Sequence, residues 1–270
     1  MADLPQLNTD APNPARRYNY WLGGKDHFAA DRASGDEIAK EFPEIVAAAR
    51  ANRDFLGRAV RFLAGEGKIR QFLDIGTGIP APGNTHEVAQ GMAPKARVVY
   101  VDIDPLVMVH ARALATSGPQ GSTDYIKADL REPAEILNAP QLHATLDLGQ
   151  PVAVLLVAVL HFLTDDDQAR LAVGKLIGAM PAGSYVLISH ATSELIGDHD
   201  PTRLHYLMRS DGGHGPFKFR TGVEITALVD GMELVEPGLV PIQAWHSDPG
   251  STGSSDDQLG MYAVVARKAG

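Results

Sequence analysis

The sequence predicts an α/β protein built around a mostly parallel β-sheet. Short apolar segments alternate along the chain with segments of helical period, which is typical of parallel strands joined by right-handed helical crossovers. The longest apolar run, residues 152–160, ends at His161 and suits a strand that is buried on both faces. A chain of 270 residues with a hydrophobic fraction of 44% suits one such domain with appendages better than two full domains.

Three helices are predicted before the first strand. Asn13 and Pro14 supply an N-cap and a first helical residue, and a Gly-Gly pair ends that helix. The second helix covers about residues 28–40, and the third opens near Pro43 and continues with apolar residues at steps of three or four. Asn52 is a polar residue on this apolar stripe, so it must find a hydrogen-bond partner if it is buried.

Strands and helices alternate from residue 71 onward. Short apolar runs predict strands at residues 71–75, 97–103, 125–128, 152–160 and 184–189. Helices are predicted between and after them, at residues 84–90, 105–115, 134–137 and 166–180. In the tail, Thr221 and Glu224 form a capping box that opens a further helix, and residues 233–245 and 261–267 resemble two more strands. Residues 191–220 have no clean period and are interpreted as an insertion.

Composition excludes several functional classes. The chain has no cysteine, which rules out disulfides, iron–sulfur clusters, cysteine zinc sites and a cysteine nucleophile. With 24 Lys and Arg against 33 Asp and Glu, the net charge is −9, which disfavours nucleic acid and anionic membranes as partners. The first ten residues lack the basic and apolar regions of a signal peptide, and no apolar run approaches the length of a membrane span. We therefore expect a cytoplasmic protein.

A glycine-rich turn carries the strongest chemical signal. Residues 74–81 (DIGTGIPA) directly follow the first predicted strand of the sheet, and ligands of such sheets bind at the carboxyl ends of strands. Glycine at this place lets the backbone approach a ligand closely. Gly76, Gly78 and Ala81 fit the dinucleotide spacing G-x-G-x-x-G/A. An acidic residue two places before the first glycine is instead typical of methyltransferases that use S-adenosylmethionine (SAM).

Three aspartates at successive strand ends favour SAM. A carboxylate at Asp74 would repel a pyrophosphate, whereas it can engage the α-ammonium group of SAM. Asp102 ends the second predicted strand, where it can accept hydrogen bonds from ribose hydroxyls in either cofactor class. Asp129 follows the third strand, where its carboxylate could receive a hydrogen bond from an adenine amino group.

With these residues in place, the sequence resembles the class I SAM-dependent methyltransferases. More narrowly, it is similar to an S-adenosyl methyltransferase family catalogued as a domain of unknown function. The resemblance is carried by residues 15–32 (ARRYNYWLGGKDHFAADR), 72–78 (FLDIGTG) and 99–105 (VYVDIDP). Supporting matches are residues 51–56 (ANRDFL), 160–163 (LHFL) and 233–239 (ELVEPGL). Together these segments extend over nearly the whole chain.

The resemblance implies a Rossmann-like, seven-stranded sheet whose last strand is antiparallel, and an N-terminal helical lid over the cofactor. Residues 1–67 would form the arm and lid, and residues 68–270 the SAM-binding domain with its insertion. The sequence departs from the methyltransferase pattern at Pro80, where the glycine-rich turn of methyltransferases often has a third glycine, and Pro82 follows it. Neither proline can donate a backbone hydrogen bond, so we expect a longer, stiffer turn and a helix delayed to about Asn84.

The predicted cofactor-binding residues lie on the strand-end turns and in the N-terminal segment. They are Asp74, Gly76, Thr77, Gly78, Asp102, Ile103, Asp129, Leu130, Ala158, Arg17, Lys25 and Asn52. Arg17 or Lys25 could bind the cofactor carboxylate, or both could cap a helix end and pack on the sheet. Asn52 could contact the cofactor or bond within the lid, and Arg53 beside it is expected to bond within the lid or face solvent.

The candidate catalytic residues are His161 and Tyr20. His161 follows the fourth strand at the carboxyl edge and could act as a general base, or it could be a packed histidine. Tyr20 could form a wall of the pocket. His190, His199, His205 and His214 are weaker candidates, and their spacings match no metal-ligand pattern, so we expect no metal.

The resulting prediction is a SAM-dependent methyltransferase that transfers a methyl group in line to a small-molecule acceptor. Val157-Ala158 stands where methyltransferases of amides or adenine carry a polar motif, which weighs against base methylation in nucleic acid. Two alternatives remain at this stage. The first is an NAD-dependent oxidoreductase, and the second is a non-catalytic protein that binds SAM or regulates through it.

Overall fold

The computed structural model describes residues 8–114, 117–197, 215–247 and 258–270. Its centre is an eight-stranded sheet in the order β3-β2-β1-β4-β5-β8-β6, with β7 paired to β8. The strands are β1 Gln71–Ile75, β2 Arg97–Asp102, β3 Ser122–Lys127, β4 Ala153–Val157, β5 Tyr185–Ala191, β6 Glu233–Leu234, β7 Val240–Pro241 and β8 Met261–Arg267. Strands β1 to β5 are parallel, whereas β8 is antiparallel to β5, β6 and β7. This arrangement confirms the predicted α/β class and the mostly parallel sheet.

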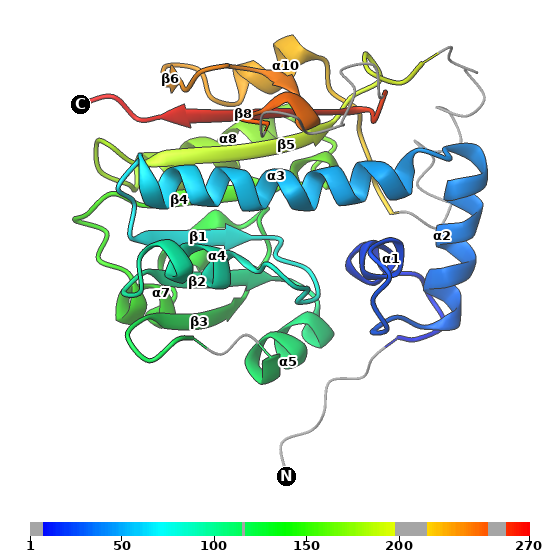
Figure 1. Ribbon diagram of the computed structural model, residues 1–270, viewed down its shortest axis with the longest axis horizontal. Helices are drawn as coiled ribbons and strands as arrows, with labels where there is room; N and C mark the ends of the chain where they lie inside the picture. The colour runs from blue at the N-terminus through cyan, green and yellow to red at the C-terminus, as the bar shows by residue number, and fades with distance from the viewer. Residues whose placement is uncertain (1–7, 115–116, 198–214, 248–257) are drawn as a thin grey trace.

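Helices cover both faces of the sheet (Figure 1). The α-helices are α1 Pro14–Trp21, α2 Ala29–Glu41, α3 Ile45–Gly65, α4 Thr85–Met92, α5 Pro105–Leu114, α6 Pro133–Leu137, α7 Pro140–Thr145, α8 Asp166–Gly178 and α10 Gly222–Ala227. Two short 3₁₀-helices, η1 Leu160–Phe162 and η3 Ile242–Ala244, follow β4 and β7. None of the helices in the described part of the chain has the length and apolar character that a membrane span requires.

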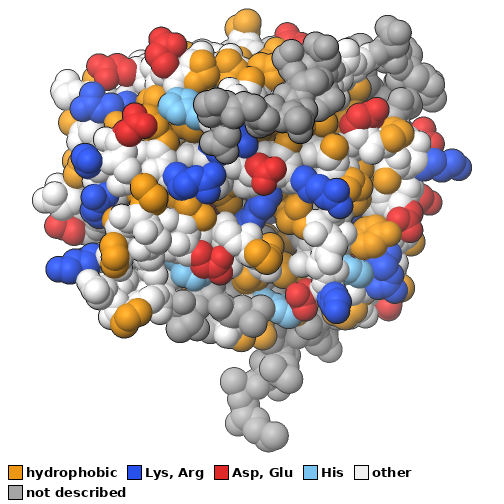
Figure 2. All heavy atoms as spheres, in the orientation of Figure 1, with side chains coloured by type: hydrophobic (Ala, Val, Ile, Leu, Met, Phe, Trp, Pro, Cys, Tyr) orange, Lys and Arg blue, Asp and Glu red, His pale blue; other side chains and the backbone are white. Residues whose placement is uncertain are grey.

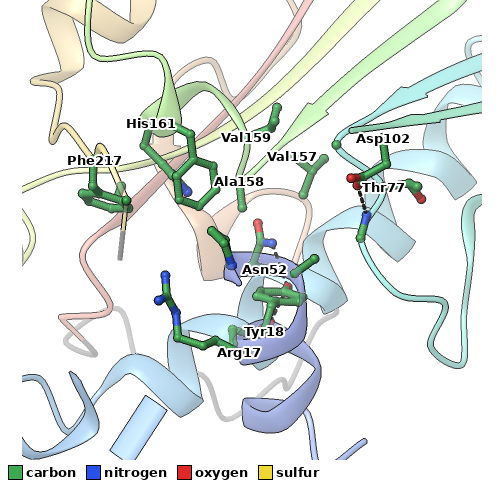
Figure 3. Close-up of a pocket in the computed structure, with 18 of the residues that line it drawn as sticks. Arg17, Tyr18, Asn52, Thr77, Asp102, Val157, Ala158, Val159, His161 and Phe217 are labelled. Carbon is green, nitrogen blue, oxygen red and sulfur yellow. Dashed lines mark hydrogen bonds between the residues drawn. The ribbon is translucent and has the colours of Figure 1, made fainter. Parts of the chain in front are cut away.

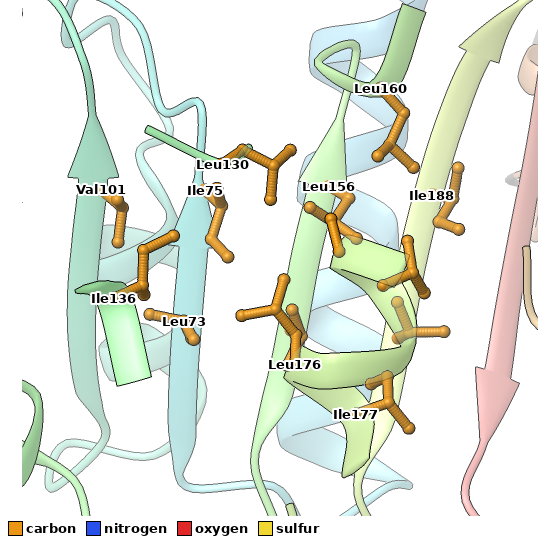
Figure 4. Close-up of a cluster of buried hydrophobic side chains, with 14 of the residues drawn as sticks. Leu73, Ile75, Val101, Leu130, Ile136, Leu156, Leu160, Leu176, Ile177 and Ile188 are labelled. Atoms are coloured by element: carbon orange, nitrogen blue, oxygen red, sulfur yellow. The ribbon is translucent and has the colours of Figure 1, made fainter. Parts of the chain in front are cut away.

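Helices α1 and α2 lie beyond the carboxyl ends of the parallel strands, whereas α3 runs across one face of the sheet (Figure 1). The apolar stripe of α3 includes Phe55, Ala59 and Leu63, and these side chains share one buried cluster with Phe72 and Leu155 of the sheet. Because successive strand residues point to opposite faces, Leu73 and Leu156 enter a second cluster on the other face (Figure 4). Helix α3 is therefore part of the core of the sheet.

The C-terminal part of the chain closes over α3. Trp245, just after η3, is fully buried, and Phe55 and Phe62 of α3 meet its ring edge to face at centroid distances of 5.5 and 5.7 Å. Arg58 of α3 donates hydrogen bonds to the carbonyls of Trp245 and Ile242, each 2.9 Å long. These contacts join residues that are more than 180 positions apart in the sequence.

The structure differs from the sequence prediction at three places. The strand expected over residues 152–160 ends at Val157, because Ala158 takes a left-handed φ of +52° and turns the chain into η1. Residues 233–245 form no single strand, since the chain turns at Gly238, with φ of +81°, between β6 and β7. Helix α7 has no counterpart in the prediction. Most of the expected insertion, residues 198–214, lies outside the described residues.

Candidate functional site

A cavity of about 490 Å³ lies at the carboxyl ends of the parallel strands and extends to α1, α2 and α3. This volume is in the range of small-molecule sites. Twelve of the fourteen predicted site residues line it: Arg17, Asn52, Asp74, Gly76, Thr77, Gly78, Asp102, Ile103, Asp129, Leu130, Ala158 and His161. Asp102 and Thr77 lie at one end, His161 and Phe217 at the other, and Asn52 and Ala158 between them (Figure 3).

The turn after β1 needs glycine for two physical reasons. Gly76 has a φ of +73° and Gly78 a φ of +67°, a backbone region that side chains rarely allow. A Cβ atom on Gly76 would lie 2.4 Å from Cγ2 of Val159, so the turn also packs closely against the segment after β4. The turn therefore presents bare backbone to the cavity.

Asp102 is locked at the end of β2. Its Oδ2 accepts a hydrogen bond from the amide of Gly78 at 2.9 Å, and its Oδ1 accepts one from the amide of Asp104 at 2.9 Å. Burial raises the pKa of Asp102 above its ordinary value, and these amide hydrogen bonds oppose the shift. The carboxylate is thus oriented in advance, and each oxygen keeps a lone pair for a ligand hydroxyl.

Asp74 is buried beneath the glycine turn. Its Oδ2 accepts a hydrogen bond from the hydroxyl of Thr85, the first residue of α4, at 2.6 Å. Burial raises the pKa of Asp74 to about 6, and the Thr85 hydrogen bond opposes that shift. A cationic group placed in the cavity next to this carboxylate would stabilise its charged form.

Asp129 has a partner that sequence reasoning missed. Arg131, two residues further on, forms an ion pair with it, with 2.6 Å between Nη2 and Oδ2. Hydrogen bonding to Arg131 lowers the pKa of Asp129, so this carboxylate is ionised at the mouth of the cavity. Both residues line the cavity, next to Leu130.

The proline-containing turn is tied to α3. Arg53 donates from Nη2 to the carbonyl of Ala81 at 2.8 Å and to Oδ1 of Asn84 at 3.0 Å. Asn84 and Glu87 form the capping box that the sequence indicates, and α4 begins at Thr85. The delayed helix is therefore confirmed, whereas Arg53 bonds to the turn after β1 and not within the lid.

Asn52 is the centre of a buried hydrogen-bond chain. Its Nδ2 donates to the hydroxyl of Tyr18 at 2.9 Å, and that hydroxyl donates to the carbonyl of Ala49 at 2.9 Å. On its other side, the hydroxyl of Ser189 in β5 donates to Oδ1 of Asn52 and accepts from the amide of Ala158 at 2.9 Å. The chain links α1, α3 and β5 to the residue whose left-handed φ ends β4.

Arg17 lines the cavity from α1, whereas Lys25 and Tyr20 lie outside it. Arg17 is buried and donates to the hydroxyl of Ser34 at 3.2 Å, and burial lowers its pKa to about 10. Lys25 is exposed after the Gly-Gly turn. Tyr20 is turned toward α2, where its hydroxyl donates to Asp36 at 2.7 Å.

His161, in η1, is buried at the far end of the cavity from Asp102. Its ring lies against Phe217, with 4.6 Å between ring centroids, and its buried Nδ1 has no hydrogen-bond partner among the described residues. The pKa of His161 is lowered well below its usual value, first by burial and then by His190 and the guanidinium of Arg220. The ring is therefore neutral at physiological pH.

His190 is held away from the cavity. Its Nδ1 donates to the carbonyl of Ala191 at 2.7 Å, and its Nε2 accepts from Nη1 of the buried Arg220 at 2.8 Å. Burial lowers its pKa to about 4. His199, His205 and His214 lie outside the described residues, and the described residues contain no cluster of His, Asp and Glu placed to hold a metal.

Comparison with known proteins identifies the family. The sequence profile of a family described as S-adenosyl methyltransferase matches residues 2–269. The chain belongs to this S-adenosyl methyltransferase family. A search of the curated proteins found no similar sequence.

Solved structures agree with this family. A DUF574 family protein from Streptomyces avermitilis is 44% identical, with a TM-score of 0.92 over 97% of this chain and 100% of that one. A candidate methyltransferase from Thermobifida fusca is 39% identical, with a TM-score of 0.88 over all of both chains. Human N-acetylserotonin methyltransferase, solved with SAM, has a TM-score of 0.51 at 16% identity, over 94% of this chain and 62% of that one, which is a likeness of fold.

The cavity suits the SAM cofactor of the family. Bare backbone at Gly76 and Gly78, the oriented Asp102 and the buried Asp74 provide surfaces for a nucleoside and for a cationic amino acid moiety. No comparable cation-binding carboxylate is expected beside the pyrophosphate of a dinucleotide, so the oxidoreductase alternative is not favoured.

Proposed function

We propose that this protein binds SAM along the cavity and transfers its methyl group to a small molecule held at the His161 end. One observation carries the proposal. A single cavity joins the glycine turn and Asp102 to a buried aromatic chamber around His161 and Phe217. A cofactor and an acceptor bound at these two ends would meet near Ala158, at the carboxyl edge of β4.

The residue roles follow from position and charge. Asp102 would accept hydrogen bonds from the ribose hydroxyls, and the Gly76–Gly78 turn would contact the nucleoside closely. Ile103, Asp129 and Leu130 would surround the adenine.

At the other end of the cofactor, Asp74 would face the ammonium and Arg17 the carboxylate. Lys25 and Tyr20 receive no role in the cavity, because neither lines it. Asn52 would shape the middle of the cavity, and Thr77 would lie beside the nucleoside at the Asp102 end.

Bound SAM supplies an electrophilic methyl group on a sulfonium. Positioning of the acceptor in line with this methyl group would supply much of the rate. His161 is the group that can take a proton from an acceptor that arrives protonated. Its neutral state leaves it free to accept.

A nucleic-acid acceptor is not part of the proposal. Val157 and Ala158 line the cavity in place of a polar base-binding motif. The face in Figure 2 carries basic and acidic side chains interspersed over its described part, whereas phosphate backbones require a basic surface.

Calorimetry with SAM and S-adenosylhomocysteine (SAH) tests the proposal. We expect both to bind wild type, and Asp102→Ala to lose about 1–3 kcal/mol of binding free energy, the cost of lost charged hydrogen bonds. Glu135→Ala, exposed on α6, is the matched control. Absence of binding by both ligands at millimolar concentration would refute the proposal, and binding of NADH seen by nicotinamide fluorescence would revive the oxidoreductase. SAM binding without turnover over a broad panel of metabolites would favour the non-catalytic alternative.

A further inference from the structure

The chamber around His161 is aromatic. In the described part of the chain, five aromatic side chains besides Tyr18 line this cavity: Trp21, Phe42, Phe162, Phe217 and Phe219. Phe217 meets Phe219 at a centroid distance of 5.2 Å and Phe162 at 5.9 Å, and it lies tilted against His161. Rings placed in this way favour a flat aromatic ligand that can stack or meet them edge to face.

Charge is distributed unequally along the cavity. The carboxylates that line it are Asp74, Asp102, Asp104 and Asp129, all on the β1 and β2 turns or after β3. Among the described lining residues of the His161 chamber there is no carboxylate. The guanidinium of Arg220 adds a positive charge that acts on His161. A cationic amine in this chamber would be buried without a counter-ion, which is costly.

His161 provides a polar contact in an otherwise apolar chamber. His161 lines the cavity, and its buried Nδ1 has no partner among the described residues, so a ligand hydroxyl that reaches the ring would supply a hydrogen bond that the chamber otherwise lacks. The ring is neutral, so one of its nitrogens can accept a hydrogen bond. Because burial, His190 and Arg220 keep the ring neutral, a neutral hydroxyl donor is a suitable partner for its accepting nitrogen.

We propose that the acceptor is a flat aromatic molecule whose phenolic hydroxyl donates to His161 and is O-methylated. This inference rests on the proposed function and adds the class of acceptor. The phenol oxygen forms the new bond to the methyl carbon, and the electron pair of the breaking S–C bond stays on sulfur. The phenol proton passes to His161 and then to solvent, so a sulfonium and a phenol give a thioether, an aryl methyl ether and a proton.

Three naphthalene probes that differ only in the substituent at position 2 test the hydroxyl preference on SAH-loaded protein. We would measure the binding of 2-naphthol, 2-methylnaphthalene and 2-(aminomethyl)naphthalene by fluorescence titration. We expect 2-naphthol to bind about tenfold more tightly than the methyl analogue, the value of one buried hydrogen bond. The aminomethyl compound, a cation at neutral pH, should bind at least as weakly as the methyl analogue.

Variants of His161 separate hydrogen bonding from proton transfer. His161→Phe should erase the preference for 2-naphthol over 2-methylnaphthalene while SAH binding stays unchanged. His161→Gln, which keeps an acceptor oxygen, should retain part of that preference but form less 2-methoxynaphthalene from SAM and 2-naphthol, as measured by mass spectrometry. His143→Phe, exposed on α7, is the control and should behave as wild type.

Each remaining outcome has a defined meaning. The inference is wrong if the amine binds as tightly as 2-naphthol, or if the hydroxyl preference survives in a His161→Phe protein that binds SAH. It is also wrong if a protein that binds SAH does not bind 2-naphthol. Failure of the wild-type protein to bind SAH would instead remove the proposed function and this inference with it.

Discussion

Asn52→Ala should destabilise the fold far more than an ordinary polar substitution on a helix. The change removes the hydrogen bonds that Asn52 makes with Tyr18 and Ser189, each worth about 0.5–1.5 kcal/mol. It also leaves the buried hydroxyl of Ser189 without an acceptor, which costs about 1–3 kcal/mol. Tyr18 loses less, because its hydroxyl still donates to the carbonyl of Ala49. We expect a loss of about 2–6 kcal/mol in the free energy of unfolding.

Urea denaturation followed by circular dichroism measures this loss, and a double-mutant cycle with Ser189→Ala isolates its cause. Removing Ser189 as well eliminates the unpaired hydroxyl, so the double variant should cost about 0.5–3 kcal/mol less than the sum of the single variants. The amide of Ala158 keeps the Ser189 carbonyl as an acceptor at 3.2 Å in both proteins.

The control is Asn138→Ala, at an exposed position after α6, which should change stability by less than about 0.5 kcal/mol. Additive effects of the two substitutions would refute the hydrogen-bond chain as a coupled unit. If Asn52→Ala lowers the free energy of unfolding no more than Asn138→Ala does, the hydrogen-bond chain does not stabilise the fold.

Three further predictions concern the cavity. Gly76→Ala should cost about 2–4 kcal/mol and abolish SAH binding, because the new Cβ meets Val159 and φ is positive. Its control is Gly174→Ala, on the exposed side of α8, which should be neutral or stabilising in the same urea assay. Because the folded pKa of Asp74 is raised from 3.8 to about 6, its contribution to stability is lost as pH rises from about 4 to 6. The stability of Asp74→Asn relative to wild type should therefore be greater at pH 7 than at pH 4, by on the order of 3 kcal/mol. Urea titrations of both proteins at the two pH values measure this change. An equal stability difference between variant and wild type at pH 4 and pH 7 would contradict the burial of a charged Asp74. Phe217→Ala should weaken all three naphthalene probes alike, without changing SAH affinity, and a selective loss of 2-naphthol would contradict a purely stacking role.

Local signals gave the most accurate sequence predictions. The bounds of β1 and β8, the Asn13 cap of α1 and the Asn84–Glu87 capping box agree with expectation, because each depends on residues within a few positions of one another. The turn at Ala158 was not predicted, since alanine gives no sign of a left-handed φ. Its amide is held by Ser189, 31 positions later.

The walls of the cavity were harder to predict than its floor. The glycine turn and the aspartates can be predicted because they directly follow recognisable strands. Phe217 and Phe219 fall in a stretch without helical or strand period, so no sequence pattern indicates that they line the cavity at its His161 end. The prediction that Tyr20 forms a wall of the pocket rests on its place in the chain near Arg17 and Lys25. Its position on α1 instead directs its hydroxyl to Asp36 of α2.

The contact between α3 and Trp245 has a consequence for biosynthesis. The chain emerges from the ribosome with its amino end first, at about 5–20 residues per second. Arg58 must then wait for a partner made 187 residues later, a delay of about 10–40 seconds. During that time the apolar stripe of α3 lacks the cover of Trp245 and β8, which makes this helix a candidate for chaperone binding on the nascent chain.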